Sequence, residues 1–358
     1  AAALALHRHA PERSLVVLAG PSGAREKIGE TLPPGSHTVL RSLGVWDAFL
    51  ATRPLPAYGT CSAWGSERLE PNEFIFHPDR RGWHIERRSF DAMLAAEAEK
   101  RLIAVQPAAT LLSISRQDDR WQIAMRDEAG AQQALSARFV IDASGRGAQF
   151  ASRLSVRRES DDRLVAVHVS YRLPDDRPMR DTYAAIEARP EGWWYSSLQP
   201  DGRLVVACFT DADLALALQL RESSAWLAQA LCAPHTFARF SAGVADTAPR
   251  LRLADSVMLE QVTGEDWLAA GDAASTFDPL SSQGVLKALR HGQLAAYAAS
   301  DHLGGDAKAL PKYAALLRRE YTEFLAAKRE HYARESRWPE APFWQRRRAL
   351  ADVAPLVA

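Results

Sequence analysis

Residues 271–292 contain, in one short run, groups that could bind a ligand with hydroxyls at one end and negative charge at the other. The run follows an apolar stretch of strand length that ends at Ala270. Gly271 stands where a side chain would obstruct a ligand, and Asp272 offers a carboxylate that accepts hydrogen bonds from hydroxyls. A glycine and a carboxylate at a strand end therefore predict a diol-binding turn.

A second turn and a helix start follow this carboxylate. Asp278 and Pro279 predict the turn, and polar residues 281–283 precede a helix that we expect to begin near Gly284. The first amides of a helix point outward and carry partial positive charge, which favours an anion. The run as a whole thus predicts one site for both ends of the ligand.

The sequence GDAA, then DPL, then a small-residue stretch with QG and a helix, resembles the second FAD signature of the flavoprotein monooxygenase superfamily. That superfamily includes p-hydroxybenzoate hydroxylase, flavin-dependent tryptophan halogenases and geranylgeranyl reductases. The resemblance implies that Asp272, beside Gly271, holds the flavin ribitol. It also implies that the isoalloxazine ring lies beside Pro279, Gln283, Gly284 and Val285. The helix dipole would then favour negative charge at the N1/C2=O edge of the ring.

Two earlier segments resemble further cofactor contacts of the same superfamily. The segment GETLPP is similar to a GE(S/T)xxP segment that lies against the flavin, which implies contacts from Gly29, Glu30 and Thr31. Arg87, four residues before Asp91, resembles the arginine of an R-x-x-(L/F)-D helix start that reaches the FAD phosphates. Arg88 takes that role if the register is shifted by one residue.

The segment VIDASGRG resembles the superfamily's strand with D-(A/G)-x-G after it, where the chain passes close to the dinucleotide. We expect Asp142 to fix the loop and Gly145 to permit the close approach. Arg146 can meet a phosphate.

Composition limits the class of protein. The 358 residues are 47% hydrophobic, which is enough for two closely packed domains, and the formal net charge of zero argues against a nucleic-acid partner. No apolar run reaches the roughly 18 residues of a membrane span. The three cysteines are far apart and form no metal-binding spacing, which is typical of a reducing cytoplasm, so we expect a cytoplasmic protein without a metal site.

The order of elements predicts an α/β fold. A helix over the first residues and a strand at Leu15–Leu18 correspond to the second and third elements of a dinucleotide-binding βαβ unit, and no GxGxxG precedes them in this sequence. We expect a Rossmann-like FAD-binding domain whose first strand and GxGxxG are missing, with an inserted antiparallel β-sheet substrate domain and a helical C-terminus. The expected parts are residues 1–150 (FAD-binding, with an inserted segment at about 51–85), 151–256 (β-sheet substrate domain), 257–300 (FAD-binding, second part) and 301–358 (helical C-terminal region).

Local patterns predict individual elements. An amphipathic helix is expected over Thr38–Leu50, a second helix capped by Ser89, and a buried parallel strand at Phe139–Ile141. Alternation with a period of two predicts four strands of the antiparallel sheet, at residues 165–173, 182–188, 192–199 and 203–211.

The substrate side differs from the halogenases within the superfamily. Where a halogenase carries WxWxIP, this chain has Trp193, Trp194 and Tyr195, which we expect to line the substrate pocket because the same sheet faces the substrate in relatives. A halogenase also uses a lysine after its GE(S/T)xxP segment, and none occurs between Lys27 and Lys100. No catalytic residue is assigned by the sequence; His77 or His84 could relay a proton, but ordinary polar packing is the favoured interpretation of both.

Three functions are compatible with these residues. The first is an FAD-dependent aromatic monooxygenase, with NAD(P)H as reductant, that acts through a flavin C4a-hydroperoxide. Its substrate would be an aromatic ring, such as a tryptophan side chain of a partner protein, because GETLPP, WWYS and the terminal RW-x-x-x-x-FW-x-R-R most resemble bacterial flavoproteins that modify tryptophan in partner quinoprotein oxidases. The alternatives are a flavin-dependent reductase or halogenase-like enzyme, and a partner-binding maturation protein on a degenerate flavoprotein fold.

Overall fold

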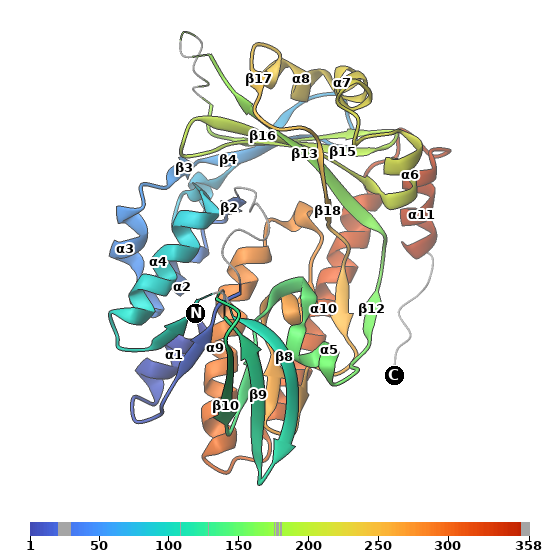
Figure 1. Cartoon of the computed structure of the whole chain (residues 1–358). Coiled ribbons are helices and arrows are strands. Elements are labelled where there is room, and N and C mark those ends of the chain that lie inside the picture. Colours follow the sequence, from blue (N-terminus) through green and yellow to red (C-terminus); the bar gives the residue numbers. More distant parts are fainter. Residues whose placement is uncertain are drawn as a thin grey trace.

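A computed structural model describes residues 1–20, 30–107, 109–127, 129–174, 176, 179 and 181–351. The molecule has a large sheet at the top of Figure 1 and an α/β part below it. The predicted mixed α/β architecture with a helical C-terminal region is confirmed. Among the described residues, none of the helices combines the length and apolarity that crossing a bilayer requires.

The large sheet has eight strands, and four of them are the predicted ones. Its order is β17-β13-β16-β15-β14-β4-β5, with β18 also paired to β13. The pairs among the four predicted strands are antiparallel, whereas β14 and β4 run parallel. The strands are β4 (Gly59–Ala63), β5 (Glu70–Glu73), β13 (Leu164–Arg172), β14 (Ala184–Arg189), β15 (Gly192–Leu198), β16 (Arg203–Asp211), β17 (Val244–Ala245) and β18 (Arg250–Leu253).

The segment around residues 51–85 therefore contributes to the large sheet as well as to the α/β part. Two of its strands, β4 and β5, extend the large sheet at one edge. Two others form a separate three-stranded sheet with the strand of the GETLPP segment, in the order β2-β6-β3, so only β6 pairs with that segment. These strands are β2 (Glu30–Leu32), β3 (Leu55–Ala57) and β6 (Gly82–Ile85). The domain boundaries given above stay predictions.

The α/β part contains short parallel pairs and a meander. The predicted parallel strand is present, since β11 (Val140–Asp142) runs parallel to β21 (Trp267–Ala269). In the same way β1 (Val16–Leu18) pairs in parallel with β7 (Ala104–Gln106). The meander consists of β8 (Thr110–Gln117), β9 (Arg120–Arg126) and β10 (Gln132–Ala137), and the remaining strands are β12 (Arg158–Ser160), β19 (Val257–Leu259), β20 (Thr263–Gly264) and β22 (Ser275–Thr276).

Helices cover both parts. In Figure 1, α7 and α8 lie on the outer face of the large sheet, whereas α10 and α11 approach it from the side of the α/β part. The α-helices are α1 (Ala2–His9), α2 (Ser36–Ser42), α3 (Trp46–Ala51), α4 (Arg87–Glu99), α5 (Gln149–Arg153), α6 (Ala212–Ala217), α7 (Ser223–Leu231), α8 (Pro234–Phe240), α9 (Gly284–Leu303), α10 (Ala309–Ala333) and α11 (Pro342–Ala351). The short 3-10 helices are η1 (Phe74–Phe76), η2 (Gly145–Gly147), η3 (Gly271–Ala273) and η4 (Pro279–Ser281).

Two local predictions were wrong. The single helix expected over Thr38–Leu50 is two helices, α2 and α3, because Gly44 takes a φ of +69° and breaks the helical path. Helix α4 is capped by Glu86, whose carboxylate accepts from the backbone N–H of Arg88 and of Ser89. Ser89 is consequently inside the helix, and Arg87 is its first residue.

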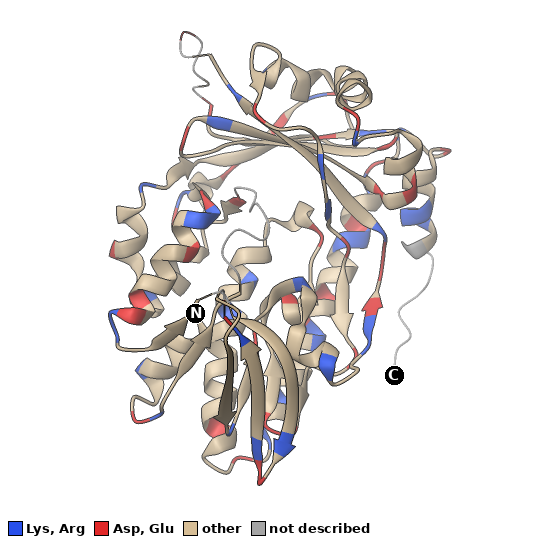
Figure 2. Ribbon diagram, in the orientation of Figure 1, with Lys and Arg blue, Asp and Glu red and all other residues tan. Residues whose placement is uncertain are grey.

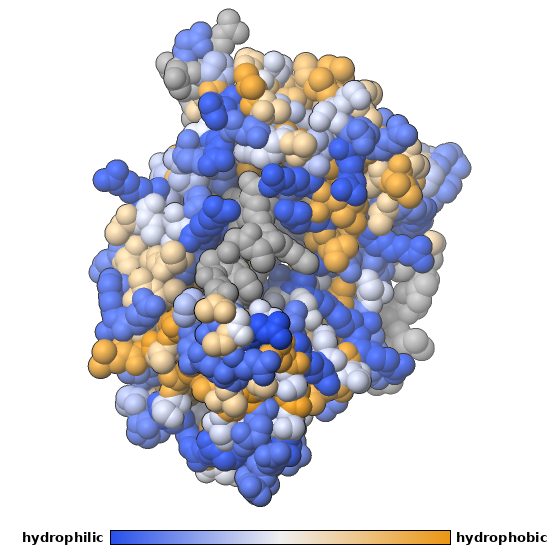
Figure 3. Space-filling view, in the orientation of Figure 1, coloured by the Kyte–Doolittle hydropathy of each residue, from blue (hydrophilic) through white to orange (hydrophobic). Residues whose placement is uncertain are grey.

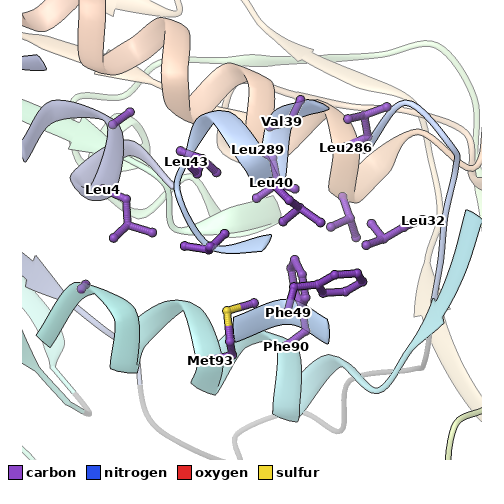
Figure 4. Packing of buried hydrophobic residues seen from close by; sticks show 14 of the residues in the cluster. Leu4, Leu32, Val39, Leu40, Leu43, Phe49, Phe90, Met93, Leu286 and Leu289 are labelled. Carbon is purple, nitrogen blue, oxygen red and sulfur yellow. The ribbon is translucent and has the colours of Figure 1, made fainter. Parts of the chain in front are cut away.

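The apolar core of the α/β part fixes the helix that begins at Gly284. Leu286 and Leu289 of α9 pack on the inner residues of α2, α3 and α4 (Figure 4). The buried residues of this cluster labelled in Figure 4 are Leu4, Leu32, Val39, Leu40, Leu43, Phe49, Phe90, Met93, Leu286 and Leu289. Burial of aliphatic side chains of this size stabilises by about 1.5–3 kcal/mol each, so the start of α9 has a firm support.

Charged residues of both signs are distributed over both parts of the ribbon (Figure 2).

Candidate functional site

The turn after β21 requires a glycine, as the sequence predicts. The structure adds a reason besides room for a ligand, which is the packing of this turn against α9. Gly271 has a φ of +61°, in the left-handed region that favours glycine. A Cβ at this position would lie 3.2 Å from the Cβ of Ala288 on α9. The glycine therefore allows the close approach of strand end and helix, which places Asp272 beside the start of α9.

Asp272 is held by a buried lysine that sequence analysis did not identify. The Nζ of Lys287 donates to Asp272 Oδ1 at 3.1 Å and also to the carbonyl of Ser275. The Lys287 side chain is 4% exposed and that of Asp272 is 39% exposed, so the lysine lies beneath and the carboxylate faces solvent. Burial lowers the pKa of Lys287, and the charge of Asp272 opposes this shift.

The start of α9 is not crowded by the described residues. None of their atoms lies within 4 Å of a Cβ built on Gly284, and Gln283 caps the helix without a side-chain hydrogen bond. Pro279 begins η4, which leads into this helix, whereas Val285 is buried in the core. The first amides of α9 are therefore available to an anionic group.

Glu30 and Arg87 form an ion pair near the same turn. Strand β2 pairs with β6, and the Nη1 of Arg87 at the start of α4 donates to Glu30 Oε1. The Nη2 of Arg87 donates to Asp91 at 3.4 Å. Surrounding protein raises the pKa of Glu30; Arg87 opposes the shift and the nearby Asp272 carboxylate adds to it. Glu30, Arg87 and Asp272 thus belong to one electrostatic cluster.

The loop after β11 is fixed by Asp142, as the sequence indicates. Asp142 Oδ1 accepts from the N–H and the hydroxyl of Ser144, and its Oδ2 accepts from the N–H of Phe150 and of Ala151. Gly145 has a φ of +72°, and a Cβ there would meet no atom of the part of the chain that the structure describes within 4 Å. The loop therefore leaves room for a ligand beside Gly145.

Arg146 lies beside a second arginine that sequence analysis did not identify. Its Nη1 donates to the carbonyl and carboxylate of Asp255, at 3.1 and 2.8 Å. Arg158 on β12 is close to both: surrounding protein lowers its pKa, Asp255 opposes the shift and Arg146 adds to it. Two neighbouring guanidinium groups suit an anion with several oxygen atoms.

A buried hydrogen-bond chain connects the large sheet to the Asp278 turn. The Nε1 of Trp193 donates to the hydroxyl of Tyr332 at 2.9 Å, and that hydroxyl donates to Asp278 Oδ2 at 2.8 Å. Asp278 Oδ1 accepts from the N–H of Leu280 at 2.9 Å, which forms the predicted turn. Burial raises the pKa of Asp278, and the positive charge of Lys328 opposes the shift. The chain fixes the turn relative to the sheet.

The three aromatic residues of β15 do not share one face. Trp193 stacks on Phe209 at 3.9 Å on the face toward the α/β part. Tyr195 packs on this same face, and its hydroxyl bonds to Thr31 at 3.1 Å. Trp194 points the other way and packs at 5.1 Å on Trp226, beneath α7 and α8. Trp194 is therefore removed from the predicted substrate pocket, because neighbouring residues of a strand point to opposite faces.

Several of the remaining predicted residues meet where the sheet faces the α/β part, since Tyr195 bonds to Thr31 and Glu30 pairs with Arg87. Figure 3 shows hydrophilic and hydrophobic residues mixed over this side of the molecule. Gly29 lies outside the described residues. Within the described ranges, no group of His, Cys, Asp and Glu could hold a metal ion. Lys287, Asp255, Arg158 and Tyr332 are the partners that sequence analysis missed; the one signal was a lysine on the buried side of a helix start.

Comparisons with known proteins bear on the family and the fold of this chain. The family model described as tryptophan halogenase matches residues 62–356. A putative FAD-dependent oxidoreductase, LodB, from Marinomonas mediterranea is 31% identical over 360 residues, a match that covers 99% of this chain and 95% of the relative.

Two solved structures share the fold. The flavin-dependent halogenase CmlS superposes with a TM-score of 0.84 at 23% identity, covering 97% of this chain and 64% of the halogenase. This chain thus spans just under two thirds of the halogenase's length. The peptidyl tryptophan dihydroxylase QhpG, essential for tryptophylquinone cofactor biogenesis, superposes with a TM-score of 0.79 at 20% identity, covering 100% of this chain and 77% of the dihydroxylase.

Proposed function

This chain belongs to the tryptophan halogenase family of FAD-dependent enzymes, and from that membership we propose that it is a monooxygenase acting on an electron-rich aromatic ring. The observation that carries the proposal is the junction of Asp272, the Glu30–Arg87 pair and the start of α9 beneath the face of the sheet that bears Tyr195. Such a junction brings a flavin-binding turn and an aromatic-lined sheet face together. We propose further that the ring is a tryptophan side chain of a partner protein, as the activity in the name of QhpG suggests.

The residues present fit FAD. The exposed carboxylate of Asp272 suits the ribitol hydroxyls, and the open start of α9 suits negative charge at the edge of the isoalloxazine ring. Gly145 leaves space for close approach of the dinucleotide. The buried Nε of Arg87 has no hydrogen-bond partner in the described part of the chain, so one N–H donor of this guanidinium remains without an acceptor.

We assign the phosphates to arginines. Arg87 and the pair Arg146–Arg158 carry the positive charge that a pyrophosphate requires. Arg146 and Arg87 are already oriented by carboxylates, which lowers the entropy lost when they bind.

Bound FAD supplies the activation of oxygen; the chain's own residues bind, orient and exclude water. The chain Trp193–Tyr332–Asp278 fixes the turn that would lie beside the ring. Trp193 and Phe209, stacked on the inner face, are buried beside Phe343 and Trp344 and so stiffen the sheet rather than contact a ligand. Tyr195, which is only partly buried, is the aromatic side chain of β15 that could contact an aromatic substrate.

Halogenation is the second candidate, supported by the family as a whole. Two features of this chain argue against it. No lysine occurs between Lys27 and Lys100. Lys287, the lysine placed at the flavin turn, is buried and is bonded to Asp272 and Ser275, so its amine is not offered to an oxidant.

The reductant and the compartment are also proposals. We expect NAD(P)H to supply the electrons, either directly or through a separate reductase. Cys61 and Cys208 are buried free thiols, and Cys232 is an exposed one, which is in keeping with a reducing cytoplasm.

The test is a comparison of products. The purified chain is loaded with FAD, confirmed by the visible absorbance of oxidised flavin, and given oxygen with NAD(P)H or with chemically reduced FAD. A tryptophan-containing peptide is the substrate, with and without chloride or bromide. Addition of oxygen to the peptide, both with and without halide, supports the proposal, and addition of halogen contradicts it. A chain that binds no FAD would favour a maturation protein instead.

A further inference from the structure

A buried polar network links the sheet face to the GETLPP segment. Thr31 on β2 lies opposite His84 on β6, and the Thr31 hydroxyl is 2.8 Å from His84 Nδ1. The hydroxyl of Ser197 on β15 is 3.0 Å from the same nitrogen. The hydroxyl of Tyr195, two residues before it, is 3.1 Å from Thr31 Oγ1. On the far side, His84 Nε2 is 2.6 Å from the carbonyl of Thr182.

The carbonyl of Thr182 sets the direction of the hydrogen bonds at His84. A carbonyl oxygen only accepts, so Nε2 must carry a hydrogen and donate it. Burial lowers the pKa of His84 to about 4, so the ring is neutral at physiological pH and Nδ1 carries no hydrogen. Nδ1 is therefore an acceptor.

The direction of the hydrogen bond at His84 Nδ1 also determines the direction of the hydrogen bond at Tyr195. Nδ1 has a single lone pair, and the Thr31 hydroxyl at 2.8 Å is a nearer donor to it than the Ser197 hydroxyl at 3.0 Å, which has another acceptor in the carbonyl of Leu198. Thr31 therefore donates its only hydroxyl hydrogen to Nδ1, and Thr31 Oγ1 can then only accept from Tyr195. Tyr195 thus donates inward. Ser197 is within hydrogen-bonding reach of both the phenol and Nδ1, but one hydroxyl hydrogen serves only one of them at a time. At least one lone pair of the Tyr195 oxygen remains for an outside donor.

The neighbours of Tyr195 favour a ligand with a donor. The side chain is half-buried, on the same sheet face as Trp193 and close to Glu30. Glu30 is already bonded to Arg87, so the phenol oxygen is the neutral acceptor at this point of the face. A ring N–H would satisfy it, whereas a ring without a donor would leave it unpaired.

We propose that Tyr195 is a specificity residue that accepts a hydrogen bond from the ring N–H of an indole substrate, with its own hydrogen committed to Thr31 and His84. The inference rests on the proposed function and names the feature of the ring that is recognised. Donation of the indole hydrogen to Tyr195 orients the ring and increases its electron density, which assists attack by an electrophilic oxygen. Thr31 and His84 are positioning residues, since they act through Tyr195.

The first test needs no substrate. In protein labelled with nitrogen-15 at histidine, the His84 resonances are identified as those that shift in Ser197→Ala. The expected result is a hydrogen on Nε2 and none on Nδ1. A hydrogen on Nδ1 would reverse the chain and overturn the inference, whether or not the protein is active.

The second test compares two ligands that differ only in the donor. FAD-loaded protein is given N-acetyl-tryptophanamide and its benzothiophene analogue, in which sulfur replaces the ring N–H. We expect the wild type to favour the indole about tenfold in kcat/KM, and Tyr195→Phe to lose that preference. The matched control is Tyr171→Phe, because Tyr171 packs against Phe240 on the opposite face of the sheet and should retain the preference.

The outcomes separate the two proposals. An indole preference that survives in Tyr195→Phe, or that is absent from the wild type, contradicts the inference alone. Oxygenation of neither compound by the wild type contradicts the proposed function, and the histidine measurement still decides the direction of the chain.

Discussion

Replacement of Asp272 by alanine has two expected effects, because the carboxylate has Lys287 on one side and, in the proposed complex, the FAD ribitol on the other. Its exposed side would hold the ribitol, and its other side neutralises the ammonium of Lys287. Asp272→Ala should therefore weaken FAD binding and also leave a charged group, 4% exposed, without its carboxylate.

The two effects have different sizes. Loss of a charge-assisted hydrogen bond of about 1.5–3 kcal/mol corresponds to roughly ten- to a hundredfold weaker FAD binding. Removal of one partner of a fully buried ion pair destabilises by about 3–5 kcal/mol. Asp272 is 39% exposed and Lys287 keeps its bond to Ser275, so we expect a loss of about 1–2 kcal/mol in the free energy of unfolding.

The double variant Asp272→Ala/Lys287→Met separates the effects. Without the ammonium, the free energy of unfolding measured in urea should return close to that of the wild type, while FAD binding, followed by flavin fluorescence, stays weak. Lys287→Met alone is the control. If the double variant binds FAD as tightly as the wild type, Asp272 does not hold the ribitol and the assignment is refuted.

The pH dependence of Asp272→Ala gives an independent check. Burial lowers the pKa of Lys287 in the folded protein below its unfolded value. The folded state then releases a proton more readily than the unfolded state, so stability rises as the pH increases between the two values. Loss of Asp272 lowers the folded pKa further, and the stability deficit of Asp272→Ala should therefore shrink as the solution becomes alkaline.

Three further predictions concern stability and binding. Tyr332→Phe leaves two buried partners, Trp193 and Asp278, unpaired and should lower the free energy of unfolding by about 1–3 kcal/mol. The control is Tyr321→Phe, which should change this free energy little because the buried Tyr321 hydroxyl has no partner among the described residues. Urea unfolding measures both variants. Gly271→Ala should destabilise the protein by about 1–2 kcal/mol because Gly271 has a positive φ. Gly284→Ala should leave stability intact but weaken FAD binding, because its methyl group fills the space before α9. Thermal melts and FAD titrations measure the two effects. His84 has a folded pKa of about 4 against 6.5 unfolded, so the unfolded state binds more protons between these values; acidification through this window should remove about 3 kcal/mol of stability, and a flat profile would contradict a neutral, buried His84.

Local patterns predicted the elements that carry the site. The alternation over residues 165–211 predicted four strands that the structure contains, and the Gly271 to Gly292 run predicted a strand end, a turn and a helix start. These patterns depend on neighbours in sequence, which is why one sequence was enough. Glycine is the usual residue after a helix end, so the break at Gly44 could have been predicted from the sequence. The Glu86 cap could not, because serine is the preferred capping residue and Ser89 stands three positions later.

The contacts across the site could not be predicted in the same way. Period-two alternation places Trp193 and Tyr195 on one face and Trp194 on the other, but it does not say which face meets the α/β part. The pairs of Asp278 with Tyr332 and of Arg146 with Asp255 join residues 54 and 109 positions apart. Only the tertiary fold brings such residues together.

The most direct test of the account is the mass of a tryptophan-containing substrate after turnover under isotopically labelled dioxygen, with chloride and bromide present. The account predicts that FAD-loaded protein and reductant add labelled oxygen to the indole ring and no halogen. An indole that gains chlorine or bromine, or that remains unchanged while FAD is bound and reduced, would contradict it.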